Sequence, residues 1–117
     1  MNKRRVGEFY EEKALAYLKK QGFRLCTKNF RVRQGEIDLI GYDGDTLVFA
    51  EVKYRRGKGL KNAMESVTYQ KQVQICRISL FYLNKYKISL QSAIRYDVIA
   101  IDDGKICWIK NAFPFRG

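Results

Sequence analysis

The feature that most constrains this chain is a pair of alternating segments joined by an Asp-Gly turn. Residues 35–42 and 46–54 each contain a stretch that alternates apolar and polar side chains, at 36–39 and 50–53, and Asp43-Gly44-Asp45 stands between the two segments. Alternation with a period of two is typical of β-strands, and Asp-Gly between two such segments favours a tight hairpin. The sequence therefore predicts an antiparallel hairpin in the middle of the chain.

This hairpin gathers charged side chains into one patch. Neighbouring side chains of a strand point to opposite faces, so Glu36 and Asp38 share a face of the first strand. By the same rule Glu51 and Lys53 share a face of the second strand. The apolar positions between them are expected to point into the core: Ile37, Leu39, Val48, Ala50 and Val52.

The register of the hairpin depends on the length of its turn. A two-residue turn at Asp43-Gly44 puts Glu36 opposite Glu51, whereas a four-residue turn puts Asp38 there. A three-residue turn without a bulge separates the groups onto opposite faces. Like charges opposite one another are destabilising, so the first two registers favour a compensating divalent cation. The alternative is that these are ordinary solvent-facing charges of a half-exposed sheet, with Lys53 neutralising a carboxylate.

The rest of the chain predicts one mixed sheet with helices packed on it. The expected elements are a helix over 7–20 that ends at Gly22, a strand over 23–32, a helix over 66–86 that begins at Ser66, and a second hairpin that pairs 94–101 with 105–110. This order indicates a single α/β or α+β domain over residues 1–117. The core-facing stripe of the long helix is expected to be Val73, Cys76, Leu80 and Leu83.

Composition restricts the chemistry of any active site. The chain contains no histidine, which excludes Ser-His-Asp and Cys-His catalysis. A metal site must then be built from carboxylates, which suit Mg²⁺ or Mn²⁺. Cys26, Cys76 and Cys107 are widely spaced and form no Cys-x-x-Cys pair. They are expected to be reduced thiols rather than a disulfide framework or a zinc site.

The charge of the chain points to a polyanionic partner. Lysine and arginine number 23 against 12 acidic residues, which gives a net charge of +11. Such an excess favours DNA, RNA or an anionic membrane surface, and it does not separate DNA from RNA. No segment is long and apolar enough to span a bilayer, and the basic start lacks the apolar stretch of a signal peptide. We therefore expect a cytoplasmic protein without a membrane partner.

Charged residues outside the hairpin extend the same pattern. Glu11 continues the inward helical stripe of Ala14, Leu15 and Leu18, which is costly unless it is paired, metal-bound or solvated at the rim. Bases flank the hairpin on both sides: Arg31, Arg33, Arg55, Arg56, Lys58 and Lys61. Residues 55–61 are expected to form a mobile loop. An acidic metal patch rimmed by bases suits phosphodiester cleavage, although a charge run can also be simply solvated.

These residues resemble a known family. Asp38 followed after a hairpin by Glu51-Val52-Lys53 is similar to the PD-(D/E)xK signature of restriction-endonuclease-like nucleases. More closely, the chain resembles the YraN (UPF0102) family, which is related to archaeal Holliday-junction resolvases. The matching stretches cover nearly the whole chain: Glu11-x-x-Ala14, Gly35-Glu36-Ile37-Asp38-Leu39-Ile40, Val48-Phe49-Ala50-Glu51-Val52-Lys53, Lys71 and Arg95-Tyr96-Asp97-Val98.

The resemblance implies a restriction-endonuclease-like α/β fold, with an α-β-β-β-α-β core and a mixed sheet flanked by helices. It implies that Asp38 and Glu51 are metal ligands, joined by the carbonyl of Val52 and by Glu11 directly or through water. Lys53 would orient or deprotonate the attacking water and stabilise charge on the phosphate. Glu36 and Lys71 would be supporting residues.

The function that follows is a Mg²⁺- or Mn²⁺-dependent endonuclease that hydrolyses DNA, with branched or junction DNA as the expected substrate class. Asp38, Glu51 and Lys53 would be catalytic, and the flanking bases would hold neighbouring phosphates. Related resolvases act as symmetric dimers because two strands must be cut, which implies a homodimer. The alternative is a non-catalytic nucleic-acid-binding protein that retains the nuclease fold.

Overall fold

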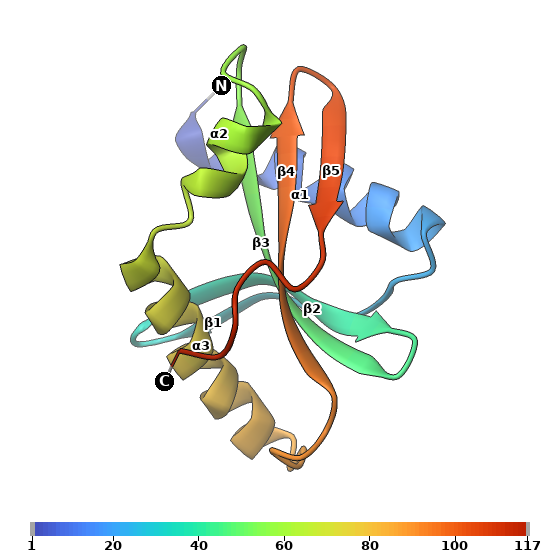
Figure 1. The fold of residues 1–117 in the computed structure, drawn as a ribbon, viewed down its shortest axis with the longest axis vertical. Coiled ribbons are helices and arrows are strands. Elements are labelled where there is room, and N and C mark those ends of the chain that lie inside the picture. The colour runs from blue at the N-terminus through green and yellow to red at the C-terminus, as the bar shows by residue number, and fades with distance from the viewer. Residues whose placement is uncertain (1, 117) are drawn as a thin grey trace.

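The computed structural model describes residues 2–116 and confirms an α/β architecture (Figure 1). The elements follow the order α1 (Lys3–Lys20), β1 (Arg24–Val32), β2 (Gly35–Asp43), β3 (Thr46–Arg55), α2 (Leu60–Glu65), α3 (Tyr69–Lys85), β4 (Ile94–Asp102) and β5 (Lys105–Ile109). The five strands form one mixed sheet in the order β1-β2-β3-β4-β5. Only the β3–β4 pair is parallel, because α2 and α3 form the crossover between these two strands.

Helix α1 begins earlier than its hydrophobic pattern predicts. The Asn2 side chain accepts a hydrogen bond of 2.9 Å from the backbone N–H of Arg5 and caps the first turn. Gly22 takes a left-handed φ of 98° just beyond the helix, which confirms the predicted stop. Ala14 and Leu18 are buried, so α1 packs on the sheet through the predicted stripe.

The predicted helix from Ser66 is wrong at its start. The Ser66 hydroxyl donates to the carbonyl of Ala63 at 2.6 Å and closes the short helix α2. Helix α3 begins after Thr68, whose hydroxyl accepts from the N–H of Lys71 at 3.2 Å. The buried face of α3 is also rotated from the predicted stripe: Leu80 is 38% exposed, and the buried residues are Ile75, Cys76, Ile78, Ser79, Tyr82 and Leu83.

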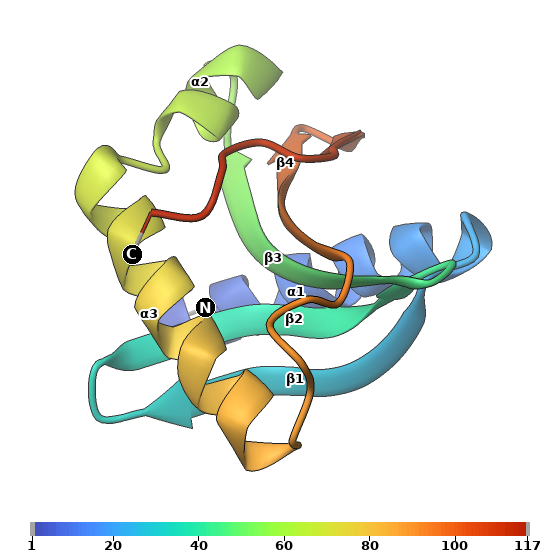
Figure 2. The ribbon, with the colours of Figure 1, turned by 60° about the horizontal axis from the view of Figure 1, so that its bottom comes forward.

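Helices cover both faces of the sheet (Figure 2). Phe49 packs with α3 residues such as Tyr82 on one face, whereas Val48 packs with Leu18 of α1 on the other. The five apolar hairpin positions are buried as predicted, but they divide between two hydrophobic clusters instead of one. A half-exposed sheet with a solvated polar face is therefore the wrong description of this hairpin.

The C-terminal segment closes the face that α3 covers. The backbone N–H of Ala112 donates to the carbonyl of Tyr96 at 2.8 Å, and the rings of Phe113 and Tyr96 stack with centroids 5.6 Å apart. The segment then crosses toward α3 (Figure 1), where the N–H of Arg116 donates to the sulfur of Cys76. Among the described helices, none is long and apolar enough to cross a membrane.

Candidate metal centre and its basic surroundings

The register of the central hairpin brings Asp38 level with Glu51. Pairing runs from Asp43↔Thr46 to Leu39↔Ala50, and the next pair along would be Asp38 and Glu51. This is the register of the longer predicted turn, although the turn itself contains only Gly44 and Asp45. The register with Glu36 opposite Glu51 is wrong.

The sheet opens at Asp38. Strand pairing between β2 and β3 stops at Leu39↔Ala50, and β3 then rises away from β2 (Figure 1). The Val52 N–H, which no longer meets a β2 carbonyl, donates to Asp38 Oδ2 at 2.8 Å. On the other side Asn29 stands between the pairs Lys28↔Leu39 and Phe30↔Ile37, with a left-handed φ of 55°. Asparagine tolerates this conformation better than most residues. Asp38 therefore lies where both neighbouring strands are distorted.

Three carboxylates meet at this opening. Glu11 from α1, Glu36 and Asp38 each offer an oxygen within 4.8 Å of the others. Glu51 of β3 adjoins the same group, since the strand register brings it level with Asp38. The Asp38 carboxylate accordingly raises the pKa of both Glu51 and Glu11. Glu36, expected from the resemblance to be a supporting residue, lies within the cluster itself. We call Glu11, Glu36, Asp38 and Glu51 the carboxylate cluster.

Burial and mutual repulsion disfavour negative charge in the carboxylate cluster. Desolvation, followed by the charge of Asp38, raises the pKa of Glu11 to about 7, although Asn29 lowers it in part. The same two causes raise the pKa of Glu51 well above its usual range, and Lys71 and Lys53 offset only part of that rise. Without a counter-ion, both glutamates therefore hold protons more tightly than ordinary carboxyls.

Two oxygens of the cluster lack a hydrogen-bond partner. Within residues 2–116, Glu11 Oε1 and Glu51 Oε2 are buried and have no hydrogen-bond partner, although the Lys71 ammonium lies 4.0 Å from Glu51 Oε2. Asp97, which is fully buried in the same protein, is satisfied: it accepts from Arg95, from Trp108 Nε1 at 2.8 Å and from the N–H of Asn111 at 2.8 Å. A buried carboxylate oxygen normally has a partner. The cluster offers several carboxylate oxygens in a poorly solvated place, and two of them lack hydrogen-bond partners. It therefore fits a hard divalent cation such as Mg²⁺ or Mn²⁺.

Two lysines adjoin the cluster. Lys71, in the first turn of α3, has its ammonium 4.0 Å from Glu51 Oε2. Lys53 follows Glu51 by two residues on β3, and its charge lowers the pKa of Glu51. The parallel β3–β4 pairing continues through Lys53↔Ala100, so the strand that carries Lys53 is held after it leaves β2.

A hollow of about 460 Å³ leads to the cluster. Its lining residues come from the start of α1 and from the β1–β2 pair: Lys3, Arg4, Gly7, Glu8, Glu11, Asn29, Arg31 and Glu36. Arg31 binds Glu36 through its Nε at 3.1 Å and a terminal nitrogen at 2.6 Å. The hollow is therefore the side from which a ligand reaches Glu11 and Glu36. Arg33, at the exposed β1–β2 turn, does not line it.

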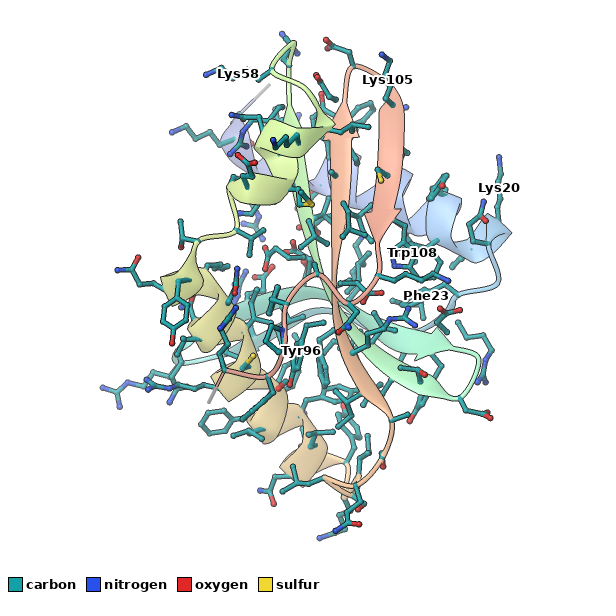
Figure 3. All side chains as sticks on the ribbon, in the orientation of Figure 1. Lys20, Phe23, Lys58, Tyr96, Lys105 and Trp108 are labelled. Carbon is teal, nitrogen blue, oxygen red and sulfur yellow. The ribbon has the colours of Figure 1, made fainter. Side chains whose placement is uncertain are left out.

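The other predicted bases follow β3. Gly57 and Gly59 donate their backbone N–H groups to Asp102 at 2.7 and 2.6 Å, so this segment is tethered to the end of β4. The expected loop over 55–61 is wrong in its bounds, because Arg55 is the last residue of β3 and residues 60–65 are helical. Arg55 is engaged with Asn62 at 3.0 Å, and Lys61 lies 3.8 Å from Glu65. Arg56 and Lys58 are exposed, with Lys58 near the tip of the segment (Figure 3).

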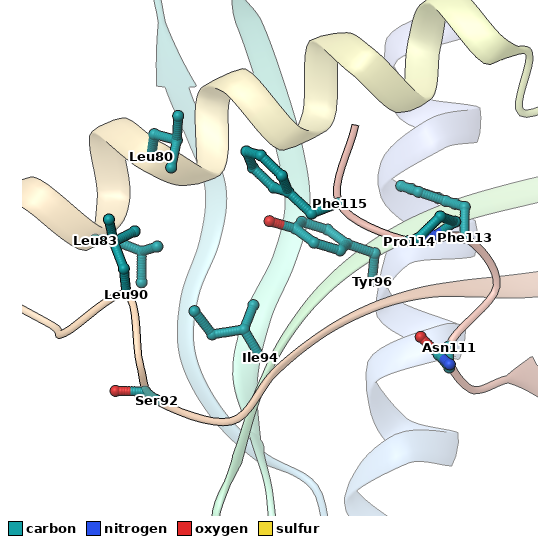
Figure 4. A pocket seen from close by; sticks show the side chains of 10 residues that line it. All are labelled: Leu80, Leu83, Leu90, Ser92, Ile94, Tyr96, Asn111, Phe113, Pro114 and Phe115. Carbon is teal, nitrogen blue, oxygen red and sulfur yellow. The ribbon is translucent and has the colours of Figure 1, made fainter. Parts of the chain in front are cut away.

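A second hollow, of about 550 Å³, lies away from these charges (Figure 4). It is bounded by α3, the start of β4 and the C-terminal segment, and its lining includes Leu83, Ile94, Tyr96, Phe113 and Phe115. No acidic or basic side chain lines it. It therefore offers no carboxylate ligand for a metal, and we do not associate it with the candidate site.

The sequence does not predict the roles of several residues of the site. The left-handed conformation of Asn29 and the position of Glu36 in the cluster both occur where the sheet opens. The alternation of apolar and polar residues does not predict this opening. In the sequence Asp102 is typical of a turn, and nothing there predicts that it accepts hydrogen bonds from Gly57 and Gly59. The bases at the start of α1 could have been identified from the sequence, because positive charge in the first turn of a helix is unfavourable to the helix dipole.

Comparison with known proteins identifies the family of this chain. Residues 10–101 match the sequence model of the Uncharacterised protein family UPF0102. A UPF0102 protein of Herminiimonas arsenicoxydans is 48% identical over 107 residues, covering 92% of this chain and 85% of that protein. One from Aliivibrio fischeri is 47% identical over 95% of this chain and 93% of its own length, and one from Legionella pneumophila is 44% identical over 92% of each. The chain belongs to the UPF0102 family.

Proposed function

We propose that this protein is a Mg²⁺- or Mn²⁺-dependent endonuclease that hydrolyses phosphodiester bonds in DNA, with branched or junction DNA as the favoured substrate. One observation carries the proposal: buried and partly buried carboxylates converge where β2 and β3 part, and two of their buried oxygens lack hydrogen-bond partners. Structural carboxylates such as Asp97 are satisfied instead. The net charge of +11 supports a polyanionic substrate.

Glu11, Asp38 and Glu51 are the proposed ligands, with the carbonyl of Val52 completing the set and Glu36 beside them. When bound, the cation would polarise a phosphoryl oxygen and neutralise charge that builds on the phosphate. Asp38 would also have a structural role, because its Oδ2 accepts a hydrogen bond from the Val52 N–H at the point where the strands separate.

Lys53 is the proposed proton carrier. As an amine it would take a proton from the attacking water, and as an ammonium it would stabilise charge on the phosphate. Lys71 would balance Glu51 and hold its carboxylate in place, since its ammonium lies 4.0 Å from Glu51 Oε2. Arg31, Arg33, Arg56 and Lys58 would bind neighbouring phosphates and set the register of the strand. Lys61, whose exposed pair with Glu65 holds it only weakly, would join them, whereas Arg55, which donates to Asn62 and to the Tyr54 carbonyl, would contribute less.

A cleavage assay tests the proposal. Labelled four-way junction, flap, linear duplex and single-stranded DNA are incubated with the protein and Mg²⁺, Mn²⁺ or chelator. We expect metal-dependent cutting that falls by about 100-fold or more in Lys53→Ala. Lys19→Ala, an exposed lysine at the far end of α1, is the matched control and should cut like the wild type. Cutting that persists in Lys53→Ala or in chelator would refute the proposal.

The second candidate is a nucleic-acid-binding protein without turnover. It is favoured by the tethered segment after β3, whose exposed bases Arg56 and Lys58 need no metal to contact phosphates. The same assay separates the two, because this candidate requires that DNA is bound yet left intact under every cation.

A further inference from the structure

The start of α1 carries positive charge where a helix disfavours it. Lys3, Arg4 and Arg5 occupy the first turn, and this turn contains no acidic residue. The helix dipole places partial positive charge at this end, so these bases oppose the stability of α1. Lys19 and Lys20, in the last turn, have the opposite and favourable placement. The bases of the first turn therefore have a reason other than helix stability.

Two of these bases line the hollow beside the carboxylate cluster. Lys3 and Arg4 line the hollow that also contains Glu11 and Glu36, and Arg31 lines it from β1. The side chain of Arg4 is 87% exposed and lies 3.6 Å from Glu8 on the same helix, an exposed pair that holds it only weakly. It can therefore turn toward a ligand at little cost.

The charges that line the hollow cancel. Its three bases, Lys3, Arg4 and Arg31, are matched by three acids, Glu8, Glu11 and Glu36. A phosphodiester entering the hollow thus meets little net positive charge from its lining. A divalent cation in the carboxylate cluster would add positive charge beside this lining and make the hollow attractive to an anion.

We infer that Lys3 and Arg4, together with Arg31, form a backbone-binding subsite that receives the phosphodiester next to the reacting one, and that it does so only when a divalent cation occupies the carboxylate cluster. The inference rests on the proposed function. It assigns the N-terminal turn a role in gripping the substrate strand and makes this grip dependent on the metal. Because linkage is reciprocal, the strand would also tighten binding of the cation.

The test measures binding rather than cleavage. Fluorescence anisotropy is recorded for labelled single-stranded DNA, duplex DNA and single-stranded RNA, with Mg²⁺, Mn²⁺ or chelator, and gels verify that the probe is intact. The variant is Lys3→Ala/Arg4→Ala, and its control Lys19→Ala/Lys20→Ala removes the same charge from the other end of α1. Thermal melts should show the first variant to be as stable as the wild type or more so, because it relieves the helix dipole.

With either cation we expect the Lys3→Ala/Arg4→Ala variant to bind about tenfold more weakly or worse, and its salt dependence on single strands to fall by about 1.4 in logarithmic slope. The control should stay within about twofold of the wild type, and in chelator the two variants should behave alike. Equal losses in both variants, or an equal loss with and without metal, would overturn the inference. If the wild type cleaves DNA but the Lys3→Ala/Arg4→Ala variant binds as the wild type does, the proposed function holds and the subsite is refuted. If the variant shows the expected loss of binding but the wild type cleaves nothing, the subsite holds and the proposed function is refuted. The three probes identify whether DNA or RNA supplies the backbone.

Discussion

At the scale of single residues, Asp38 combines a repulsive charge with a structural hydrogen bond. Its carboxylate raises the pKa of both Glu11 and Glu51, yet its Oδ2 accepts the Val52 N–H at 2.8 Å. Asparagine removes the charge and keeps an oxygen acceptor, whereas alanine removes both. The two substitutions therefore separate the electrostatic cost of Asp38 from its structural benefit.

We predict that Asp38→Asn raises the free energy of unfolding of the metal-free protein by about 1 kcal/mol, because it relieves repulsion among buried carboxylates. Asp38→Ala should lower it by about 1–3 kcal/mol, because the Val52 N–H loses its partner. Urea titrations in chelator measure both values. If Asp38→Asn is as destabilised as Asp38→Ala, the negative charge of Asp38 is a structural requirement and the metal-site assignment fails.

Glu11 predicts a pH dependence of stability. Its pKa rises from 4.5 to about 7 on folding, so the folded chain binds this proton more tightly than the unfolded chain. The stabilisation is complete below pH 4.5 and is lost as the pH rises through about 7. After allowance for solvent screening it amounts to about 1–2 kcal/mol, and Glu51 acts in the same direction.

Melts in chelator from pH 5 to pH 8 should therefore show declining stability in the wild type and a flatter profile in Glu11→Gln. A saturating divalent cation should remove most of the decline, because it replaces the proton as counter-charge. Parallel profiles for the wild type and Glu11→Gln would show that Glu11 does not carry this linkage.

At the scale of elements, the end of β4 holds the basic segment after β3. Asp102 accepts from Gly57 and Gly59, and it is buried whereas its neighbour Asp103 is exposed. We predict that Asp102→Asn, which leaves one oxygen acceptor, destabilises the protein by about 1.5–3 kcal/mol. The amide protons of Gly57 and Gly59 should also exchange faster with solvent.

The matched control is Asp103→Asn, which changes the same charge one residue away. It should leave both the stability and the amide exchange of the segment unchanged. Equal exchange rates in the two variants would show that the segment is ordered by something other than Asp102.

Local patterns predict elements better than boundaries in this chain. Both hairpins and the stop of α1 at Gly22 follow from turn residues and periodicity, which act over a few neighbours. The start of α3 does not, since Ser66 and Thr68 are equally good N-caps by type and only packing selects Thr68. Leu80 was misplaced because apolar side chains occupy more than one face of α3, and only packing on the sheet selects the buried face.

At the scale of the whole molecule, the candidate site follows from the sequence only in part. Period-two alternation puts Asp38, Glu51 and Lys53 on facing strands, and the helical stripe directs Glu11 inward. The left-handed conformation of Asn29 and the meeting of Glu11 on α1 with Glu36 and Asp38 on β2 join segments that are far apart in the sequence. That depends on the complete topology and is not encoded in any one segment.

The C-terminal segment completes one of the two cores. Phe113 is buried and stacks on Tyr96, whereas Phe115 is 51% exposed. We predict that Phe113→Ala lowers the free energy of unfolding by about 3–5 kcal/mol, and that Phe115→Ala, the matched control, lowers it by less than about 1 kcal/mol. Denaturant titrations give both values. Similar small losses would mean that the segment only covers a core that is already closed.

The most direct measurement is a calorimetric titration of the wild-type protein with Mn²⁺, repeated on Asp38→Asn, Glu51→Gln and the exposed control Asp103→Asn. The carboxylate cluster, with two buried oxygens that lack hydrogen-bond partners, predicts saturable binding that weakens by at least about tenfold in the first two variants and is unchanged in the third. Binding that is absent in the wild type, or equally strong in all four proteins, would contradict a metal centre at the opening between β2 and β3.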